Sequence, residues 1–195
     1  MALLSTTVDG ATLALGVGLV VLAVAIVSDA VIGRRGALRT SRADRGTYWT
    51  IGVAQPLAVV LGLAARVVAP GADLSGWVSV VGIVAMVAGT VLRLWSVVAL
   101  GDKFQRIVAV PPDLTLVTSG PYRCLRHPSY TGALLIFGGF GLACANALSI
   151  LVLVVLPGAA YLRRIRVEEA ELESVLGDRY RAYARGRSRL VPSVW

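Results

Sequence analysis

The stretch that decides the fold runs from Tyr130 to Leu162 and reads YTGALLIFGGFGLACANALSILVLVVLPGAAYL. Asn146 lies at the centre of this apolar block, so each half has about 16 residues and would form about 24 Å of helix. That length is slightly short for a full membrane crossing but fits a tight helical hairpin. One continuous helix is the alternative, and it would put the basic C-terminus on the external side. We therefore expect a hairpin.

The composition around this block is that of an integral membrane protein. Of the 195 residues, 56% are hydrophobic, and the mean hydropathy is +0.76, which argues against a soluble domain. The formal net charge of +8 comes from basic residues that flank apolar runs, so we expect anionic lipid rather than nucleic acid as their partner. One histidine and two separated cysteines predict no metal site and no disulfide framework.

Three further apolar runs precede the block, and each is long enough for one crossing. They are Ala11–Ile32, Tyr48–Val68 and Trp77–Leu100. The segment between the first two, Gly33–Thr47, carries five arginines and marks the cytoplasmic side by the positive-inside rule. We therefore expect an all-α, multi-pass protein of the cell inner membrane, with residues 1–195 as a single domain, five transmembrane helices and an external N-terminus.

Two polar side chains inside these spans are candidates for contacts with a substrate. Gln55 lies in the second span, and Arg93 lies about two turns before the end of the third. An ionisable residue at that depth suggests a functional site. The alternative for Arg93 is a side chain that extends to the cytoplasmic headgroups.

The polar stretch before the block, GPYRCLRHPSYTG at residues 120–132, holds the only histidine. Proline disfavours a helical conformation in the residue before it, so a helix should start after Pro128 rather than run through it. Arg126 and His127 would then lie at the mouth of a helix, where backbone N–H groups and the helix dipole favour an anionic group. The alternative is a basic membrane-proximal loop with Tyr130 as an interfacial anchor.

The final segment, Arg163–Trp195, contains eight arginines and five acidic residues, which excludes a further span. Its apolar residues recur at helical spacing and predict a cytoplasmic amphipathic helix of about five turns, with Gly177 as a flaw or an end. The last residues, from Arg187 onward, read as a tail with an aromatic interfacial anchor.

The hairpin would bring two polar motifs to the same membrane face. Arg126 and His127 form a positive end, and Glu168 and Glu169 form a negative end. This pairing suits a zwitterionic ligand with an amino-acid end. The alternatives are a solvated helix face for the glutamates, paired with arginines, and a helix-start role for His127 with a bond to a nearby carbonyl.

Residues 90–195 resemble the isoprenylcysteine carboxyl methyltransferase family, which belongs with the phospholipid methyltransferases to a wider group of integral-membrane methyltransferases. The motifs that carry this resemblance are GPYR at 120–123, RHPSYTG at 126–132, RI at 164–165, EE at 168–169 and GDRY at 177–180.

The resemblance implies a site for S-adenosylmethionine at the cytoplasmic membrane surface. Arg164 and Glu169 match the family's residues nearest the reacting methyl group and would be catalytic. Cofactor binding carries over to Arg126, His127, Tyr130, Glu168 and Glu169, with Gly132 and Leu134 expected near the cofactor.

The resemblance also divides the chain into a divergent acceptor side, residues 1–90, and a cofactor-binding core, residues 91–195. The acceptor would enter from the lipid and would be an isoprenoid or prenylcysteine carboxylate, a phospholipid amine or a thiol, with Arg93 or Arg164 able to orient an anionic acceptor. Two alternatives stay open: an NADPH-dependent membrane reductase related to the much larger sterol reductases, and a non-catalytic module that binds anionic lipid.

Overall fold

The computed structural model describes residues 10–33, 42–72, 74, 76–101 and 110–192. The regular elements within these residues are helical. The α-helices are α1 (Gly10–Gly33), α2 (Thr47–Val68), α3 (Trp77–Leu100), α4 (Pro128–Ala143), α5 (Ala147–Leu176) and α6 (Asp178–Ala184), and short 3-10 turns include η1 (Arg42–Asp44), η2 (Pro70–Ala72) and η4 (Gly120–Arg123).

The expected hairpin is present as α4 and α5. The chain reverses between Ala143 and Ala147, where Ala145 has a φ of +50°. Asn146 then caps α5, because its side chain accepts a hydrogen bond of 3.1 Å from the backbone N–H of Ser149, a typical role of asparagine at a helix start. The single continuous helix is therefore excluded, and the central polar residue of the block is a cap.

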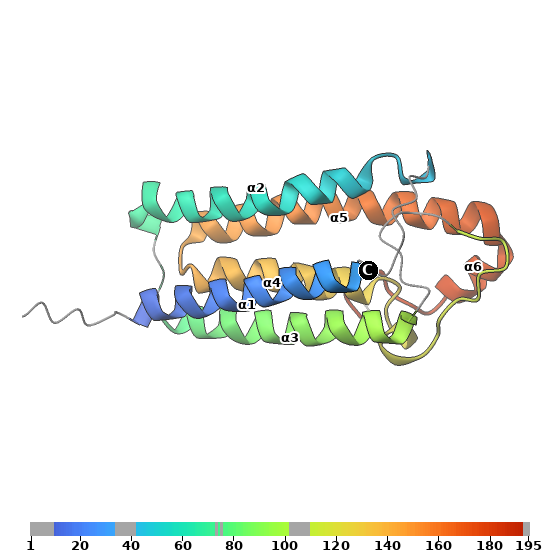
Figure 1. The fold of residues 1–195 in the computed structure, drawn as a ribbon, viewed down its shortest axis with the longest axis horizontal. Coiled ribbons are helices and arrows are strands. Elements are labelled where there is room, and N and C mark those ends of the chain that lie inside the picture. Colours follow the sequence, from blue (N-terminus) through green and yellow to red (C-terminus); the bar gives the residue numbers. More distant parts are fainter. Residues whose placement is uncertain (1–9, 34–41, 73, 75, 102–109, 193–195) are drawn as a thin grey trace, which may run out of the picture.

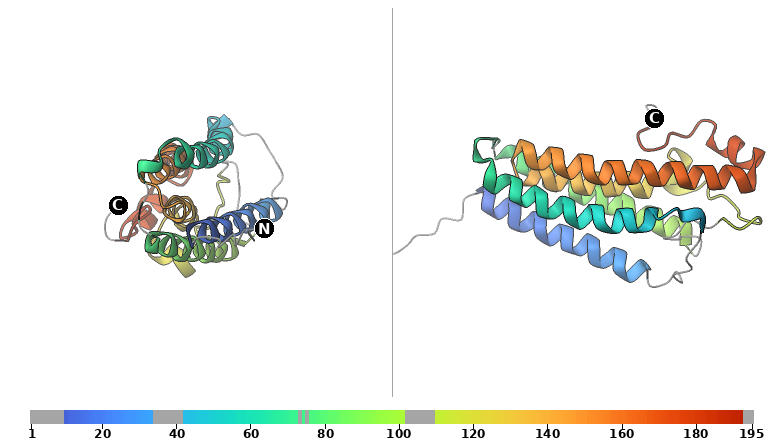
Figure 2. Two further views of the ribbon diagram at one scale, coloured as in Figure 1. Left: turned by 90° about the vertical axis from the view of Figure 1, so that its left-hand side faces the viewer. Right: turned by 90° about the horizontal axis from the view of Figure 1, so that it is seen from above.

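The long helices form a bundle in two layers (Figures 1 and 2). Helix α2 lies along α5, while α4 contacts both α3 and α5, and α1 packs on α3 and α4. The core between them includes Met86, Phe140 and Leu153, which are all fully buried. The start of α4 and the polar end of α5 lie at the same end of the bundle, where α6 also lies.

Glycines allow α3 and α4 to approach to backbone contact. A Cβ added to Gly82 would lie 2.5 Å from the carbonyl oxygen of Gly139, and one added to Gly89 would lie 2.6 Å from that of Gly132. Such distances leave no room for a side chain, and small residues at membrane-helix contacts permit this kind of packing. The two pairs therefore set the register of α4 on α3.

Three described helices are long and apolar enough to cross a membrane, namely α2, α3 and α5. Their outward faces carry exposed apolar side chains such as Val60, Val84 and Val155. Helix α4 has 16 residues, and the apolar stretch found in α1 is Leu15–Val24. The fold is thus that of a helical membrane protein, and the count of five spans stays a prediction.

The C-terminal helix differs in form from the expectation. Residues 163–176 do not start a separate helix but continue α5, because no proline or glycine interrupts them. Gly177, with a φ of +53°, ends α5 and is followed by the short α6. The expected helix is therefore divided at the glycine.

The α3–α4 contact predicts a difference between two neighbouring glycines. A Cβ at Gly139 would lie 2.6 Å from the carbonyl oxygen of Gly82, whereas one at Gly138 would meet only the Val154 side chain at 3.6 Å. We expect Gly139→Ala to lower the free energy of unfolding by about 1–3 kcal/mol through overpacking, and the control Gly138→Ala to leave it unchanged. Unfolding titrations in detergent measure both, and equal stability of the two variants would contradict the contact.

Candidate active site

The polar end of the bundle is built around the start of α4. Helix α4 begins at Pro128, as expected, and His127 precedes it as the N-cap residue without a side-chain capping bond. The imidazole ring of His127 instead stacks on the ring of Tyr130, with 5.5 Å between centroids and 6° between planes. His127 is therefore buried against the half-buried Tyr130.

The C-terminal residues fold back along this start. The backbone N–H groups of Arg126 and His127 donate to the carbonyl oxygens of Ser188, at 2.8 Å, and Arg189, at 3.1 Å. The Thr131 hydroxyl donates to the Leu190 carbonyl oxygen at 2.8 Å. Residues 188–190 of the expected tail therefore pack on the start of α4, and the expected aromatic anchor, Trp195, lies outside the described residues. No hydrophobic periodicity marks residues 188–190, so the sequence offered no signal for this contact.

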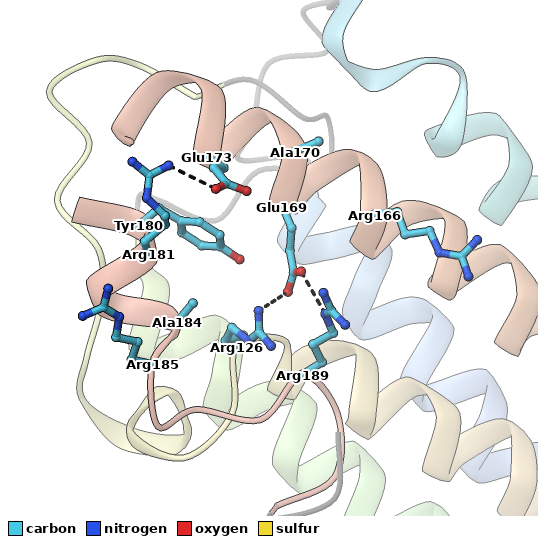
Figure 3. A pocket seen from close by; sticks show the side chains of 10 residues that line it. All are labelled: Arg126, Arg166, Glu169, Ala170, Glu173, Tyr180, Arg181, Ala184, Arg185 and Arg189. Carbon is cyan, nitrogen blue, oxygen red and sulfur yellow. Dashed lines mark hydrogen bonds and ion pairs between the residues drawn. The ribbon is translucent and has the colours of Figure 1, made fainter. Parts of the chain in front are cut away.

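Glu169 joins α5, the start of α4 and this tail. Its Oε1 accepts from Arg126 Nη1 and its Oε2 accepts from Arg189 Nε, each at 2.9 Å (Figure 3). Oε1 also lies 3.1 Å from His127 Nε2. Burial alone would raise the pKa of Glu169, but the hydrogen bonds from His127 and Arg189 and the charge of Arg126 lower it overall. The carboxylate is thus held ionised and is a weak base.

Tyr130 joins Glu168 to Arg164. The Tyr130 hydroxyl donates to Glu168 Oε2 at 2.7 Å and accepts from Arg164 Nε at 3.2 Å. Its ring lies 5.0 Å from the ring of Tyr161, whose hydroxyl accepts from Gln55 Nε2 at 2.6 Å. Hydrogen bonds and one contact between tyrosine rings therefore connect Gln55 of α2 to Glu168.

Arg164 has a partner that the sequence analysis missed. Its Nη1 donates to Asp44 Oδ1 and, at 2.8 Å, to the hydroxyl of Thr47. Arg164 and Asp44 are 3% and 5% exposed, so this is a buried ion pair. Asp44 lies in the arginine-rich segment that the sequence analysis used only to orient the chain.

Three other candidate residues lie near this cluster in different settings. Arg93 Nη1 donates to the backbone carbonyl and hydroxyl oxygens of Ser129, at 3.0 and 3.1 Å, at the start of α4. Gly132 packs against Gly89 and Arg93 of α3, and Leu134, two residues further along α4, is half-buried. The expected contacts of these three residues with ligands stay predictions.

A pocket of about 570 Å³ opens beside Glu169, between α5, α6 and the tail (Figure 3). Its lining includes Arg126, Tyr180 and Arg189. Within the part of the chain that the structure describes, neither Arg126 Nε nor the Tyr180 hydroxyl, both buried there, makes a hydrogen bond of good geometry. Burial, and then the charge of Glu169, raise the pKa of Tyr180, while the neighbouring Arg126 side chain lowers it in part, so the hydroxyl stays protonated. Two adjacent polar groups with incomplete hydrogen bonding in one pocket are typical of a site for a ligand with acceptor oxygens.

Comparisons with known proteins point to one family of methyltransferases. The model of the isoprenylcysteine carboxyl methyltransferase family matches residues 80–174. Protein-S-isoprenylcysteine O-methyltransferase B of Arabidopsis thaliana is 29% identical over 144 residues, which are 73% of this chain and 73% of that protein. The enzyme A of the same plant is 31% identical over 127 residues, 64% of each chain.

A solved structure shares the fold. The structure of the eukaryotic intramembrane Ras methyltransferase ICMT aligns with a TM-score of 0.72 and 22% identity, over 97% of this chain and 70% of that chain. This likeness spans both the motif-bearing region and the N-terminal helices. These matches in sequence and fold thus support the isoprenylcysteine carboxyl methyltransferase family for this chain and, with it, an integral-membrane methyltransferase.

Proposed function

We propose that the protein transfers a methyl group from S-adenosylmethionine to the carboxylate of a lipid-like acceptor, such as an S-prenylcysteine, at the cytoplasmic face of the membrane. The observation that carries the proposal is the pocket beside Glu169 with its two incompletely hydrogen-bonded polar groups. The names of the relatives, all protein-S-isoprenylcysteine O-methyltransferases, support the acceptor class. They also favour methyl transfer over the reductase and the non-catalytic lipid-binding module.

The pocket fits the amino-acid end of the methyl donor. Arg126 Nε and the Tyr180 hydroxyl have no acceptor of good geometry among the described residues, and a carboxylate would supply acceptor oxygens. Glu169 and Glu173 line the same pocket and would face the ammonium group. His127, Tyr130 and Glu168 would extend this binding surface toward Arg164, with Gly132 and Leu134 behind it on α4.

The chemistry requires alignment more than acid or base. When bound, S-adenosylmethionine supplies a methyl group on a positively charged sulfur, and transfer to a carboxylate oxygen forms a C–O bond while the C–S bond breaks and its electron pair stays on sulfur. No proton moves in this exchange. The residues of the chain therefore have to orient the two reactants and exclude water.

The state of Glu169 favours an acceptor that is already anionic. An amine would have to lose a proton before attack, and the lowered pKa of Glu169 makes this carboxylate a poor base. The buried guanidinium of Arg164 would instead attract an acceptor carboxylate. On the acceptor side, Gln55 reaches the same cluster through Tyr161, and Arg93 adds a second positive charge near the start of α4.

Titration calorimetry with S-adenosylhomocysteine tests the donor site. We expect the detergent-purified protein to bind this product and not NADPH. Glu169→Gln and His127→Ala should each weaken the affinity by about tenfold or more, because each removes a charge-assisted hydrogen bond from a partly buried cluster. Glu171→Gln, the same charge change two residues along α5, is the control and should bind as the wild type does. Binding of NADPH without binding of S-adenosylhomocysteine would contradict the proposal.

Tyr180→Phe separates ligand binding from stability. The hydroxyl makes no hydrogen bond of good geometry with the described residues, so its removal should leave the melting temperature unchanged or raise it. The affinity for S-adenosylhomocysteine should fall about three- to tenfold, the value of one hydrogen bond. Tyr183→Phe, on the same helix but outside the pocket lining, should change neither quantity. A lower melting temperature with unchanged affinity would assign Tyr180 a structural role instead.

The proposed orientation is tested with terminal tags in intact cells. Arginine-rich segments flank the site end of the bundle, and the positive-inside rule assigns that end to the cytoplasm. A C-terminal tag should be accessible only after permeabilisation, and an N-terminal tag should be accessible from outside. Tags on the same side would require an even number of crossings and contradict the five-span arrangement.

A further inference from the structure

We propose that Asp44, with Thr47, is a positioning residue that holds Arg164 in its working place, so that the N-terminal half of the chain completes the methyl-transfer site. The inference rests on the proposed function, which places Arg164 beside the reacting methyl group. It deepens that function, because Asp44 lies in the region expected to serve only the acceptor.

Arg164 is held along two edges of its guanidinium. Nη1 donates to Asp44 Oδ1 and to the Thr47 hydroxyl, at 2.8 Å for the latter. Nε donates to the Tyr130 hydroxyl at 3.2 Å. One edge therefore lies against the start of α2 and the other against α4. Because the guanidinium is planar, bonds along two edges leave its long side chain a single orientation.

Asp44 is itself fixed before it binds Arg164. Its Oδ2 accepts from the Tyr48 backbone N–H at 2.9 Å, so the carboxylate caps the start of α2. The Thr47 hydroxyl donates to the Asp44 carbonyl oxygen at 2.9 Å. Thr47 is fully buried and Asp44 is 5% exposed. The carboxylate thus presents one oxygen to Arg164 from a rigid turn.

The charge of Asp44 matters because Arg164 is buried. A buried guanidinium requires a close countercharge, and the other nearby carboxylate, Glu168, lies 4.0 Å from Arg164 Nε and accepts from Tyr130. Asp44 supplies the charge from the opposite side. Glu168 and Tyr130 can then serve the donor pocket without having to neutralise Arg164.

A neighbouring arginine provides a matched control. Arg163 joins the same two helices through exposed contacts, from Nη1 to the Thr50 hydroxyl at 2.7 Å and from Nη2 to the Arg45 carbonyl oxygen at 3.1 Å. It binds the start of α2 as Arg164 does but does not reach the buried cluster. A variant at Arg163 therefore removes a tether between α2 and α5 while the Asp44–Arg164 pair stays intact.

The test is steady-state methyl transfer to an S-prenylcysteine analogue. We expect Asp44→Asn to lower kcat about tenfold to a hundredfold, the range for loss of one charge-assisted hydrogen bond. The KM for S-adenosylmethionine and the affinity for S-adenosylhomocysteine should change less than about threefold, because Asp44 does not touch the pocket. Asp44→Glu should recover part of kcat, and Arg163→Gln should keep it.

Two further variants keep the proposal testable if Asp44→Asn folds poorly. Thr47→Val removes one acceptor of Arg164 with little change in volume, and it should lower kcat in the same direction by a smaller factor. In an Arg164→Lys background, Asp44→Asn should cost little more than the single Arg164 change, because residues that act through one another are not additive.

The outcomes distinguish this inference from the proposed function. Equal losses of kcat in Asp44→Asn and Arg163→Gln would reduce Asp44 to a tether between helices and overturn the inference. Full kcat in Asp44→Asn would overturn it as well, while methyl transfer by the wild type would leave the proposed function standing. A wild-type protein that neither binds S-adenosylhomocysteine nor transfers a methyl group would overturn both.

Discussion

The backbone contact between α3 and α4 is the constraint on which the arrangement depends. Two glycine pairs, Gly82 with Gly139 and Gly89 with Gly132, bring the helices to a distance that no side chain would allow. Their spacing of seven residues keeps both pairs on one helix face. This contact sets the height of α4 in the bundle, and therefore where its polar N-terminal end lies. Arg93, one turn beyond Gly89, reaches Ser129 at that end.

Two charged clusters lie beside this start of α4. In one, Glu169 is surrounded by Arg126, His127 and Arg189. In the other, Arg164 is neutralised by Asp44. Each cluster satisfies its central charge with groups from another part of the chain, as the cost of an unpaired buried charge requires. Arg189 of the C-terminal tail completes the first cluster, and Asp44, just before α2, completes the second. Residues from the N-terminal and C-terminal parts of the chain therefore meet at one site.

The two clusters suit a reaction between an ionic donor and an amphipathic acceptor. The Glu169 side opens into the pocket with its incompletely hydrogen-bonded polar groups, where a water-soluble ligand would enter. The Arg164 side continues through Tyr130 and Tyr161 to Gln55, deeper between the apolar helices. A donor from the aqueous phase and an acceptor from the lipid would meet near Tyr130, which contacts both Glu168 and Arg164 of α5.

The sequence by itself determined the features that depend on local chemistry. Helix α4 starts at Pro128 because proline suits a first turn, the hairpin follows from the length of the apolar block, and the hairpin brings the motif of Arg126 and His127 to the same end as Glu168 and Glu169. Only the tertiary structure decided the pairing of Arg164 with Asp44, the return of Arg189 to Glu169 and the glycine register of α3 on α4. These contacts join residues that are distant in the chain. They depend on which helix faces meet, and packing over the whole bundle determines this, so no local sequence pattern predicts it.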